Sequence, residues 1–592
     1  MTARRTTTLL CALALGLAIA TGASRLGAQG AAMRTLGPAD WPLHNLDTAN
    51  SRFSPLNQIT PATAPKLAVQ WQLDLPKRVA LGSATPVVVG GVMYVNAGAQ
   101  LFAIDAATGK ELWSTPPRED FKAGGRGPMY ADGKVYVVGQ ALMGAFDAET
   151  GKPVAGFGDN GVIHVARSAL QAKDPGKWAN DFDPFSIGYM LASSPTYAGG
   201  VIVMGVAQSD SMVAGGLIVA IDAATGKVKW VFRTVPQGPG DDGWELARDT
   251  WSGSDHRYGG GIWAQPAIDT ELGLVIANVS NPSPNYDGSS RKGINLFTNA
   301  MVALDLATGK LKWHFQTIHH DIWDWDLITG PTFVDAQVNG QTVKAVVSLA
   351  KTCYAYMLDR KTGQPVFPIV EMPVPTTTDV PGEQPWPTQP IPFNARFVQQ
   401  QPFCSTFPNI TDPELAARRR PMFHPYQTGS FIIQSPGLLG GPNRGSSAFS
   451  PRTGLLYVTG KNDAYSIKAK PTGDTIQPGP GSPGHFKSFI EEGPTGVKAT
   501  QNIAAFNPST GDLAWVTELP GTTNGGNLVT AGDVVYQAIN RDFYALDART
   551  GKILAKVPLK APMASTPLAY QARKKDFVAM ASGSTIVALG LP

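Results

Sequence analysis

Short apolar runs separated by polar, glycine-containing turns recur along most of the chain. Eight runs combine β-branched, aromatic and aliphatic residues: Val92–Val95, Val135–Val138, Val201–Met204, Leu274–Ala277, Val346–Ser348, Leu455–Val458, Val534–Tyr536 and Phe577–Ala579. Runs this short, bounded by turn residues, are typical of buried strands rather than helices. The hydrophobic pattern therefore predicts an all-β protein.

A turn motif, Asp/Asn-x-x-Thr-Gly, follows many of these strands. It occurs at Asp105–Gly109, Asp147–Gly151, Asp222–Gly226, Asp305–Gly309, Asp359–Gly363, Asn507–Gly511 and Asp547–Gly551. The acidic or amide side chain caps the turn and the glycine accepts a positive φ. In four copies a tryptophan lies eight residues after the first position, at Trp113, Trp230, Trp313 and Trp515. We expect these indoles to pack between neighbouring sheets.

Repeated β units of roughly 40–50 residues are typical of propellers. Eight strands predict an eight-bladed β-propeller, with seven blades as the alternative. A strand near Trp71 is expected to close the last blade and so remove an open sheet edge. The long insertions at 232–262 and 366–445 show neither helical nor strand periodicity, and we predict that they are lids or binding loops.

Composition supports a turn-rich globular protein. The chain has 592 residues, of which 64 are Gly and 48 are Pro, and only 16% are charged. A hydrophobic content of 43% excludes intrinsic disorder. The net charge is +4 and the one basic run is Arg418–Arg420, so no nucleic-acid partner is expected.

The N-terminus has the pattern of a signal peptide. Arg4 and Arg5 precede an apolar stretch from Leu9 to Ala20, which small residues follow. We predict that residues 1–28 are removed, that 29–592 form a single propeller domain exported to the periplasm, and that the mature chain has no membrane span.

Removal of this segment leaves two cysteines, Cys353 and Cys404. They form a disulfide or two buried thiols, and the sequence does not separate these readings. No Cys-x-x-Cys-His motif is present, so no c-type haem is expected.

The richest chemistry lies in His319-His-Asp-Ile-Trp-Asp-Trp-Asp-Leu327. In a strand, Asp324 and Asp326 would point to the same side. Two such carboxylates repel unless a cation holds them, and a hard metal cation with oxygen ligands is the economical explanation. The alternative is a pair of turn-capping aspartates.

Three further residues are candidates for the same site. Asn281 ends a strand and offers a metal an amide oxygen, although an Asn-Pro turn also explains it. Trp263 suits the floor of a flat cofactor site or a place in the core of a blade. Lys351 ends an apolar strand, which indicates an anionic ligand at the propeller axis or a lysine that reaches to the surface.

Taken with these residues, the chain resembles the pyrroloquinoline quinone (PQQ)-dependent dehydrogenases, the eight-bladed quinoprotein alcohol and sugar dehydrogenases. The resemblance runs from Asp40-Trp-Pro42 and Asn50-Ser-Arg-Phe53 through the Asp-x-x-Thr-Gly-Lys-x-x-Trp repeats to Ser565-Thr-Pro567. The His319–Leu327 segment is similar to the membrane glucose dehydrogenase branch.

The resemblance implies a role for each matching residue. Asp324 matches the catalytic aspartate, which takes the hydroxyl proton while hydride passes to PQQ. Asn281 matches a ligand of the active-site metal. The cofactor contacts are Trp263 below the ring, Arg126 at a PQQ carboxylate, Lys351 at the quinone oxygens and Asn443 nearby.

The chain departs from the family at several positions. Lys122-Ala-Gly-Gly replaces the vicinal cysteines of alcohol-oxidising members, so that disulfide is absent. No Glu occurs between Val203 and Gly215, where another metal carboxylate is expected, and Asp210 is the nearest acid. Asp326 resembles the extra aspartate of lanthanide-using members, but the glucose branch has it too. Arg444 stands where the family often has Trp.

The function implied is PQQ-dependent oxidation of an alcohol, polyol or sugar with Ca²⁺ or a lanthanide ion. Electrons would pass to a separate cytochrome c or to a quinone, because the chain carries no haem motif. The alternative is a non-catalytic envelope propeller that serves as a scaffold. Such a protein has no need of two acids, Lys351 and Arg126 at its axis, so the His319–Leu327 segment favours the enzyme.

Overall fold

The computed structural model describes residues 36–76, 81, 84–97, 100–116, 127–191, 193–207, 209–252, 257–405, 410–470 and 490–592. The predicted signal peptide, residues 1–28, and Arg126 lie outside these residues, so the structure does not bear on either prediction.

Successive antiparallel sheets form the body of the protein. The first four are β3 (Val87–Val89), β4 (Val92–Ala97), β5 (Gln100–Asp105) and β6 (Glu111–Ser114); β7 (Met129–Ala131), β8 (Lys134–Val138), β9 (Met143–Asp147) and β10 (Val162–Ile163); β11 (Thr196–Ala198), β12 (Val201–Val206), β13 (Leu217–Asp222) and β14 (Val228–Arg233); and β16 (Ala267–Asp269), β17 (Leu274–Asn278), β19 (Ala300–Asp305) and β20 (Leu311–Gln316).

The next four sheets repeat this meander. They are β21 (Thr332–Val338), β22 (Gln341–Leu349) and β23 (Ala355–Asp359); β27 (Ala448–Ser450), β28 (Leu455–Asn462), β31 (Thr500–Asn507) and β32 (Asp512–Pro520); β33 (Leu528–Thr530), β34 (Val534–Ile539), β35 (Asp542–Asp547) and β36 (Ile553–Pro558), joined by β1 (Phe53–Ser54); and β37 (Leu568–Ala572), β38 (Lys575–Ser582) and β39 (Thr585–Gly590), joined by β2 (Ala68–Asp74).

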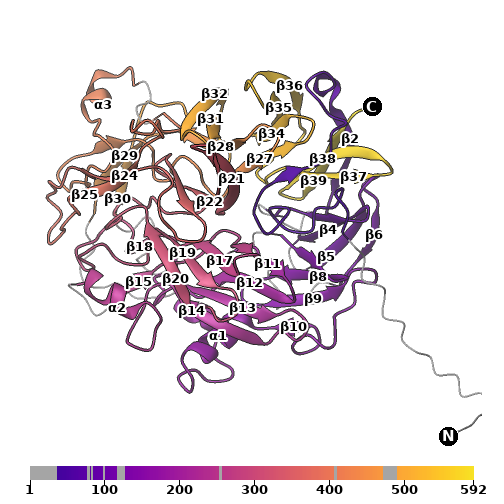
Figure 1. Ribbon diagram of the computed structural model, residues 1–592, viewed down its shortest axis with the longest axis horizontal. Helices are drawn as coiled ribbons and strands as arrows, with labels where there is room; N and C mark the ends of the chain where they lie inside the picture. The colour runs from indigo at the N-terminus through magenta and orange to yellow at the C-terminus, as the bar shows by residue number, and fades with distance from the viewer. Residues whose placement is uncertain are drawn as a thin grey trace, which may run out of the picture.

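The sheets follow one another once around the molecule, as the colour of Figure 1 shows. The first strands of several neighbouring sheets contact each other, for example β3 with β7 and β27 with β33, and so face the axis. Each of the eight apolar runs falls in the second strand of a different sheet. The predicted all-β propeller is confirmed. Eight blades stay a prediction with which these sheets agree.

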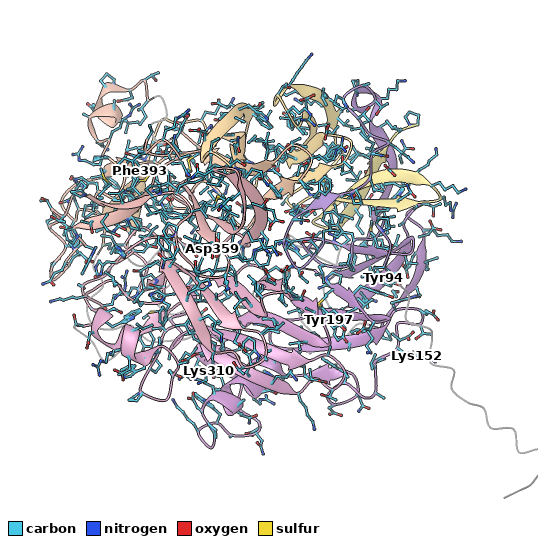
Figure 2. All side chains as sticks on the ribbon, in the orientation of Figure 1. Tyr94, Lys152, Tyr197, Lys310, Asp359 and Phe393 are labelled. Carbon is cyan, nitrogen blue, oxygen red and sulfur yellow. A yellow bond between two sulfur atoms is a disulfide. The ribbon has the colours of Figure 1, made fainter. Side chains whose placement is uncertain are left out.

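The tryptophan repeat joins several sheets to the next sheet. Trp230 of β14 lies against the turn glycine Gly309 of the following sheet and donates from Nε1 to Leu306 O at 2.9 Å. Gly309 has a φ of +72°, and a Cβ there would lie 2.5 Å from the indole, so only glycine fits. Lys152 and Lys310 are exposed at two of these turns (Figure 2). The same docking recurs at Trp71, Trp113, Trp313 and Trp515.

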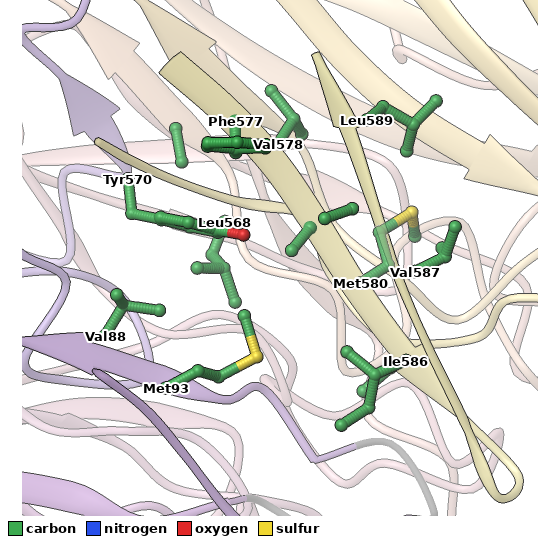
Figure 3. Close-up of a cluster of buried hydrophobic side chains, with 14 of the residues drawn as sticks. Val88, Met93, Leu568, Tyr570, Phe577, Val578, Met580, Ile586, Val587 and Leu589 are labelled. Carbon is green, nitrogen blue, oxygen red and sulfur yellow. The ribbon is translucent and has the colours of Figure 1, made fainter. Parts of the chain in front are cut away.

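The early strand β2 and the last strand β39 pair in one sheet. β2, which contains Trp71, pairs antiparallel with β39 near the C-terminus, as the sequence predicts. Val88 and Met93 of the first sheet share a buried cluster with Leu568 and Tyr570 of the last (Figure 3). Strand pairing and side-chain packing both link the last sheet to the first, which removes an open edge.

An N-terminal arm, residues 39–54, lines the axis. Its backbone forms hydrogen bonds with seven first strands, at Val88, Tyr130, Ile268, Phe333, Phe449, Val529 and Gln571. Arg52, near the end of the arm, is fully buried and donates to His44 O, Asn527 O and Pro567 O. The arm thus ties blades far apart in sequence to one another.

The insertions carry further elements. These are the helices α1 (Val165–Lys173), α2 (Trp244–Ala247) and α3 (Pro413–Ala417), and the small sheets β15 (Tyr258–Gly259) with β18 (Pro282–Ser283), β24 (Ile369–Pro373) with β25 (Thr388–Pro392), and β26 (Ile432–Gln434) with β29 (Tyr465–Ala469) and β30 (Ile490–Gly493). The 366–445 insertion therefore contains short strands that its irregular pattern did not predict. In the described part of the chain, no helix has the length and apolar character to cross a membrane.

Candidate active site at the propeller axis

The segment 319–327 is a loop, not a strand, so the alternation that we expected for Asp324 and Asp326 is wrong. Asp321 organises the loop: its carboxylate accepts from Trp323 N at 2.8 Å and from Trp325 N at 2.9 Å. The rings of Trp323 and Trp325 stack at 5.6 Å and are fully buried. Asp324 then takes a left-handed φ of +61°, which redirects its side chain.

Asp324 and Asp326 nevertheless converge, and the cation between them is Lys351. Its ammonium lies 3.1 Å from Asp324 Oδ2 and 2.6 Å from Asp326 Oδ1, and it donates to Asp324 O at 2.7 Å. Lys351 lies in the turn after β22 and is only 4% exposed. The structure thus brings together three residues that the sequence identified.

Burial and charge oppose each other in this cluster. Burial raises the pKa of Asp324 well above its ordinary value; Lys351 counters this, while Asp326 and Asp210 add to it. The pKa of Asp326 is raised by burial in the same way, again against the effect of Lys351. For Lys351, burial disfavours the charge, but the two aspartates outweigh it and raise the pKa above the ordinary lysine value. The two aspartates therefore tend to share a proton, and a further positive charge would stabilise their ionised forms.

Asp210 joins the cluster through a residue that the sequence did not identify. Asn285 donates from Nδ2 to Asp210 Oδ1 at 2.7 Å and to Asp324 Oδ1 at 3.0 Å. Asn285 is fully buried, and its Oδ1 has no hydrogen-bond partner among the described residues. The Asn-Pro-Ser-Pro-Asn segment signals a turn with two amides, but only the fold shows which amide faces the carboxylates.

Asn281, the predicted metal ligand, starts that same segment. It is buried, and its Nδ2 donates to the neighbouring Pro282 O at 2.9 Å. Among the described residues no hydrogen bond joins its side chain to Asp324 or Asp326. The side chain of Asn281 therefore makes a local contact, which agrees with an Asn-Pro turn. Its role as a metal ligand stays a prediction.

Trp263 lies beside this loop, and its role as the floor of a cofactor site stays a prediction. It packs against Ile328, four residues after Asp324, and the guanidinium carbon of Arg444 lies 5.3 Å from the centre of its ring. The indole Nε1 is buried, with no acceptor in the described structure. The exposed Arg444 thus places a positive charge over an aromatic face.

The Gly440–Arg444 loop packs tightly against Lys351. Gly440 has a φ of +65°, and a Cβ there would lie 2.3 Å from Lys351 Cβ. Gly441 donates from its backbone to Lys351 O at 2.9 Å. Asn443 donates from Nδ2 to Leu439 O at 3.0 Å, so its described bond is within its own loop and its contact with a cofactor stays a prediction.

A disulfide holds the other side of the Lys351 turn. Cys353 and Cys404 are bonded, with their Cα atoms 5.7 Å apart, which settles the choice that the sequence left open. A Cβ on Gly441 would lie 2.0 Å from Cys353 Sγ, so the disulfide and the glycine loop are in direct contact.

Two histidines of the His319–Leu327 segment contact the first part of the 366–445 insertion, residues 366–394. His320 Nε2 lies 2.7 Å from Glu383 Oε1 in a fully enclosed pair, and His319 Nε2 lies 3.0 Å from Glu371 Oε1. Glu383 also accepts from Gly288 N. These contacts attach the proline-rich insertion to the loop that carries Asp324.

The donors present suit a hard cation. Asp324, Asp326 and Asp210 supply carboxylates, and the unpartnered Asn285 Oδ1 supplies an amide oxygen. In the described residues no three His, Cys, Asp or Glu side chains already stand in a metal-binding arrangement. In this structure Lys351 lies between Asp324 and Asp326, and the Asn285 amide group lies between Asp210 and Asp324.

The chain is similar in sequence and in fold to proteins of known activity. A family model described as PQQ: glucose/ethanol/alcohol dehydrogenase, beta-propeller domain, matches residues 41–578. The dehydrogenase subunit of alcohol dehydrogenase (quinone) from Komagataeibacter europaeus is 30% identical over 92% of this chain and 72% of that protein. Quinoprotein glucose dehydrogenase A of Acinetobacter calcoaceticus is 28% identical over 92% of this chain and 77% of its own length. The crystal structure of quinohemoprotein alcohol dehydrogenase from Comamonas testosteroni has a TM-score of 0.73 at 26% identity, covering 93% of this chain and 80% of that one.

Proposed function

The chain belongs to the family of PQQ-dependent glucose, ethanol and alcohol dehydrogenases, and from this premise we propose how its axial site works. The protein is an oxidoreductase that oxidises an alcohol with PQQ. The observation that carries the proposal is the convergence of Asp324 and Asp326 on Lys351 at the axis.

Asp324 is the general base. Burial raises the pKa of its carboxyl group above the ordinary value, which favours uptake of a proton. The proton of the substrate hydroxyl passes to an Asp324 carboxylate oxygen as the carbinol carbon loses hydride and becomes a carbonyl. Lys351, which is bonded to the same carboxylate, holds it in place.

The metal ligands are Asp324, Asp326, Asp210 and an Asn-Pro-Ser-Pro-Asn amide, either Asn281 or Asn285. Trp263 supports the cofactor ring, Arg126 and Lys351 bind its polar groups, and Asn443 is a further contact. When bound, PQQ supplies the hydride acceptor, and Ca²⁺ or a lanthanide ion supplies a Lewis acid.

The substrate is an alcohol, polyol or sugar, and the electrons leave to a separate cytochrome c or quinone. We further propose that residues 1–28 direct export to the periplasm and that 29–592 act as one catalytic domain. The scaffold alternative is not favoured, because a scaffold has no use for the buried Asp324–Lys351–Asp326 cluster.

The test loads the purified protein with PQQ and either Ca²⁺ or a lanthanide ion. The expected result is quinone absorbance that co-elutes with the protein and dye reduction with at least one member of an alcohol, polyol and sugar panel. Absence of bound quinone with both metals, together with no dye reduction, would reject the proposal.

A further inference from the structure

Lys461 is a buried cation close to the axial site that the roles above do not use. It lies near the end of β28 and is 4% exposed. Its backbone N donates to Gly441 O at 3.0 Å, and Gly441 N in turn donates to Lys351 O, so one glycine bridges the two lysines. Lys461 is therefore a neighbour of the Asp324–Lys351–Asp326 cluster.

The ammonium of Lys461 donates to a neutral partner, Asn524 Oδ1. In the described structure no carboxylate forms an ion pair with it, whereas Lys351 has two. A buried ammonium without a counter-charge is costly, and proteins normally avoid it unless a ligand compensates.

The surroundings of Lys461 add positive charge and donors. Burial first, then Lys351 and Arg444, lower its pKa to about 8, and Asp463 opposes them. Gln501, its cross-strand neighbour on β31, is fully buried, and its Nε2 has no acceptor among the described residues. The Oε1 of Gln501 accepts from Thr523 N, the residue before Asn524. Several donors thus gather here with few acceptors.

Two residues near this group face solvent. Asn524 and Arg444 are exposed, and their loops meet: a Cβ on Gly445 would lie 2.5 Å from the Gly525 backbone. Lys461 therefore lies beneath a polar, solvent-facing rim. Arg444 of this rim lies over Trp263, the proposed floor of the cofactor site.

We propose that Lys461, with Asn524 and Arg444 at the rim, forms a carboxylate-binding subsite beside the Asp324–Lys351–Asp326 cluster. This rests on the proposed function. The carboxylate belongs either to the quinone cofactor, which is a planar tricarboxylate, or to a substrate that carries an acid group beside its hydroxyl. The chemistry is the same in both cases: a charge-assisted hydrogen bond to an ammonium that forms no ion pair with the described residues.

The experiment measures PQQ binding by fluorescence quenching in wild type, Lys461→Met, Lys461→Arg and the control Lys468→Met. Lys468 lies on β29 and pairs with the exposed Glu491, away from the subsite. If the cofactor supplies the carboxylate, Lys461→Met raises the Kd for PQQ by about 10- to 100-fold, the usual worth of a charged hydrogen bond. Lys461→Arg and Lys468→Met stay within about threefold of wild type.

The pH dependence provides a second readout. Wild-type affinity falls as the pH rises through about 8, where the Lys461 ammonium loses its proton. The affinity of Lys461→Arg for PQQ stays constant from pH 7 to 9, because a guanidinium keeps its charge. The nearby charges Lys351, Arg444 and Asp463 are the same in both proteins, so the difference between them reports residue 461.

If the substrate supplies the carboxylate, PQQ binding is unchanged, but Lys461→Met raises KM for 2-hydroxy acids about tenfold relative to uncharged alcohols. Unchanged PQQ affinity together with unchanged relative KM in Lys461→Met would contradict the proposed subsite.

Wild-type protein that binds no PQQ would instead contradict the proposed function. Calorimetry with benzene-1,3,5-tricarboxylate then decides the subsite: binding that Lys461→Met abolishes supports it, and no binding overturns it.

Discussion

Lys351 Nζ lies 2.6 Å from Asp326 Oδ1 and, on its other side, 3.1 Å from Asp324 Oδ2. One buried ammonium therefore holds two carboxylates that come from a loop rather than from a strand. The three groups carry a net charge of −1 when both acids are ionised, which leaves room for a further cation and suits a site that binds metal and releases protons.

Asp324→Asn is expected to retain PQQ but to lower kcat by about 10²–10⁴-fold, the typical contribution of a general base. Bound quinone is measured by absorbance and turnover by dye reduction. Asp359→Asn is a matched control, because Asn507 fills the same turn position naturally. Wild-type turnover in Asp324→Asn would remove Asp324 as the base.

Lys351→Met is expected to lower the free energy of unfolding by about 3–5 kcal/mol at pH 7, since two buried carboxylates lose their cation. Without Lys351 the pKa of Asp324, already raised, rises further. A carboxyl group whose pKa is higher in the folded than in the unfolded state stabilises the fold while protonated, and this contribution is lost as the pH rises through the folded pKa. In EDTA, the stability of the variant should therefore fall from pH 4 to pH 7 more steeply than that of wild type, as measured by urea unfolding.

The control for this experiment is Lys310→Met, at an exposed turn, which should leave stability and its pH dependence unchanged. Equal pH slopes for Lys351→Met and wild type would contradict the view that Lys351 neutralises the pair.

Asn285→Ala is expected to raise the Kd for Ca²⁺ at least about tenfold, because it removes the amide that joins Asp210 to Asp324. Isothermal titration of the metal-free protein checks this. Asn281→Ala, measured beside it, shows which amide of the segment the metal uses. Unaltered affinity in Asn285→Ala would exclude Asn285 from the site.

The Cys353–Cys404 disulfide closes a loop across a sequence separation of 51. Replacing both cysteines with serine should cost about 4 kcal/mol by the loop-entropy estimate, and guanidinium unfolding measures the loss. Because the bond abuts Gly441 beside Lys351, kcat should fall as well. Thiol titration of the unfolded, unreduced mature chain should find no free cysteine, and two free thiols would be inconsistent with the bond.

Arg52→Met should destabilise the protein by about 3 kcal/mol, since several buried carbonyl groups lose their donor. Arg573→Met, at an exposed pair with Asp105, serves as the control and should change stability by less than about 1 kcal/mol. Thermal unfolding compares the two. Equal small effects would show that the arm adds little to the ring.

The sequence alone determined the architecture, because the signals that mark each blade are local. Each Asp-x-x-Thr-Gly turn lies within a single sheet. Its aspartate accepts hydrogen bonds from the backbone amides two and three residues later, as Asp305 does. The docking of Trp230 on the next turn repeats at a regular spacing. Such short-range signals survive in a one-dimensional pattern, and they were enough to predict the strands, the turns and the closure by β2.

The tertiary structure decided the site, because its contacts join distant segments. Asp324 and Lys351 were predicted as site residues. Their pairing depends on the left-handed backbone of Asp324 and on the turn after β22, and neither can be read from the periodicity of the sequence. Asn285 and Lys461 were not identified from the sequence, because an amide after a proline and a lysine at the end of a strand are usually exposed. Only when folding excludes water around them do an unpartnered amide oxygen and an unpaired ammonium point to a ligand.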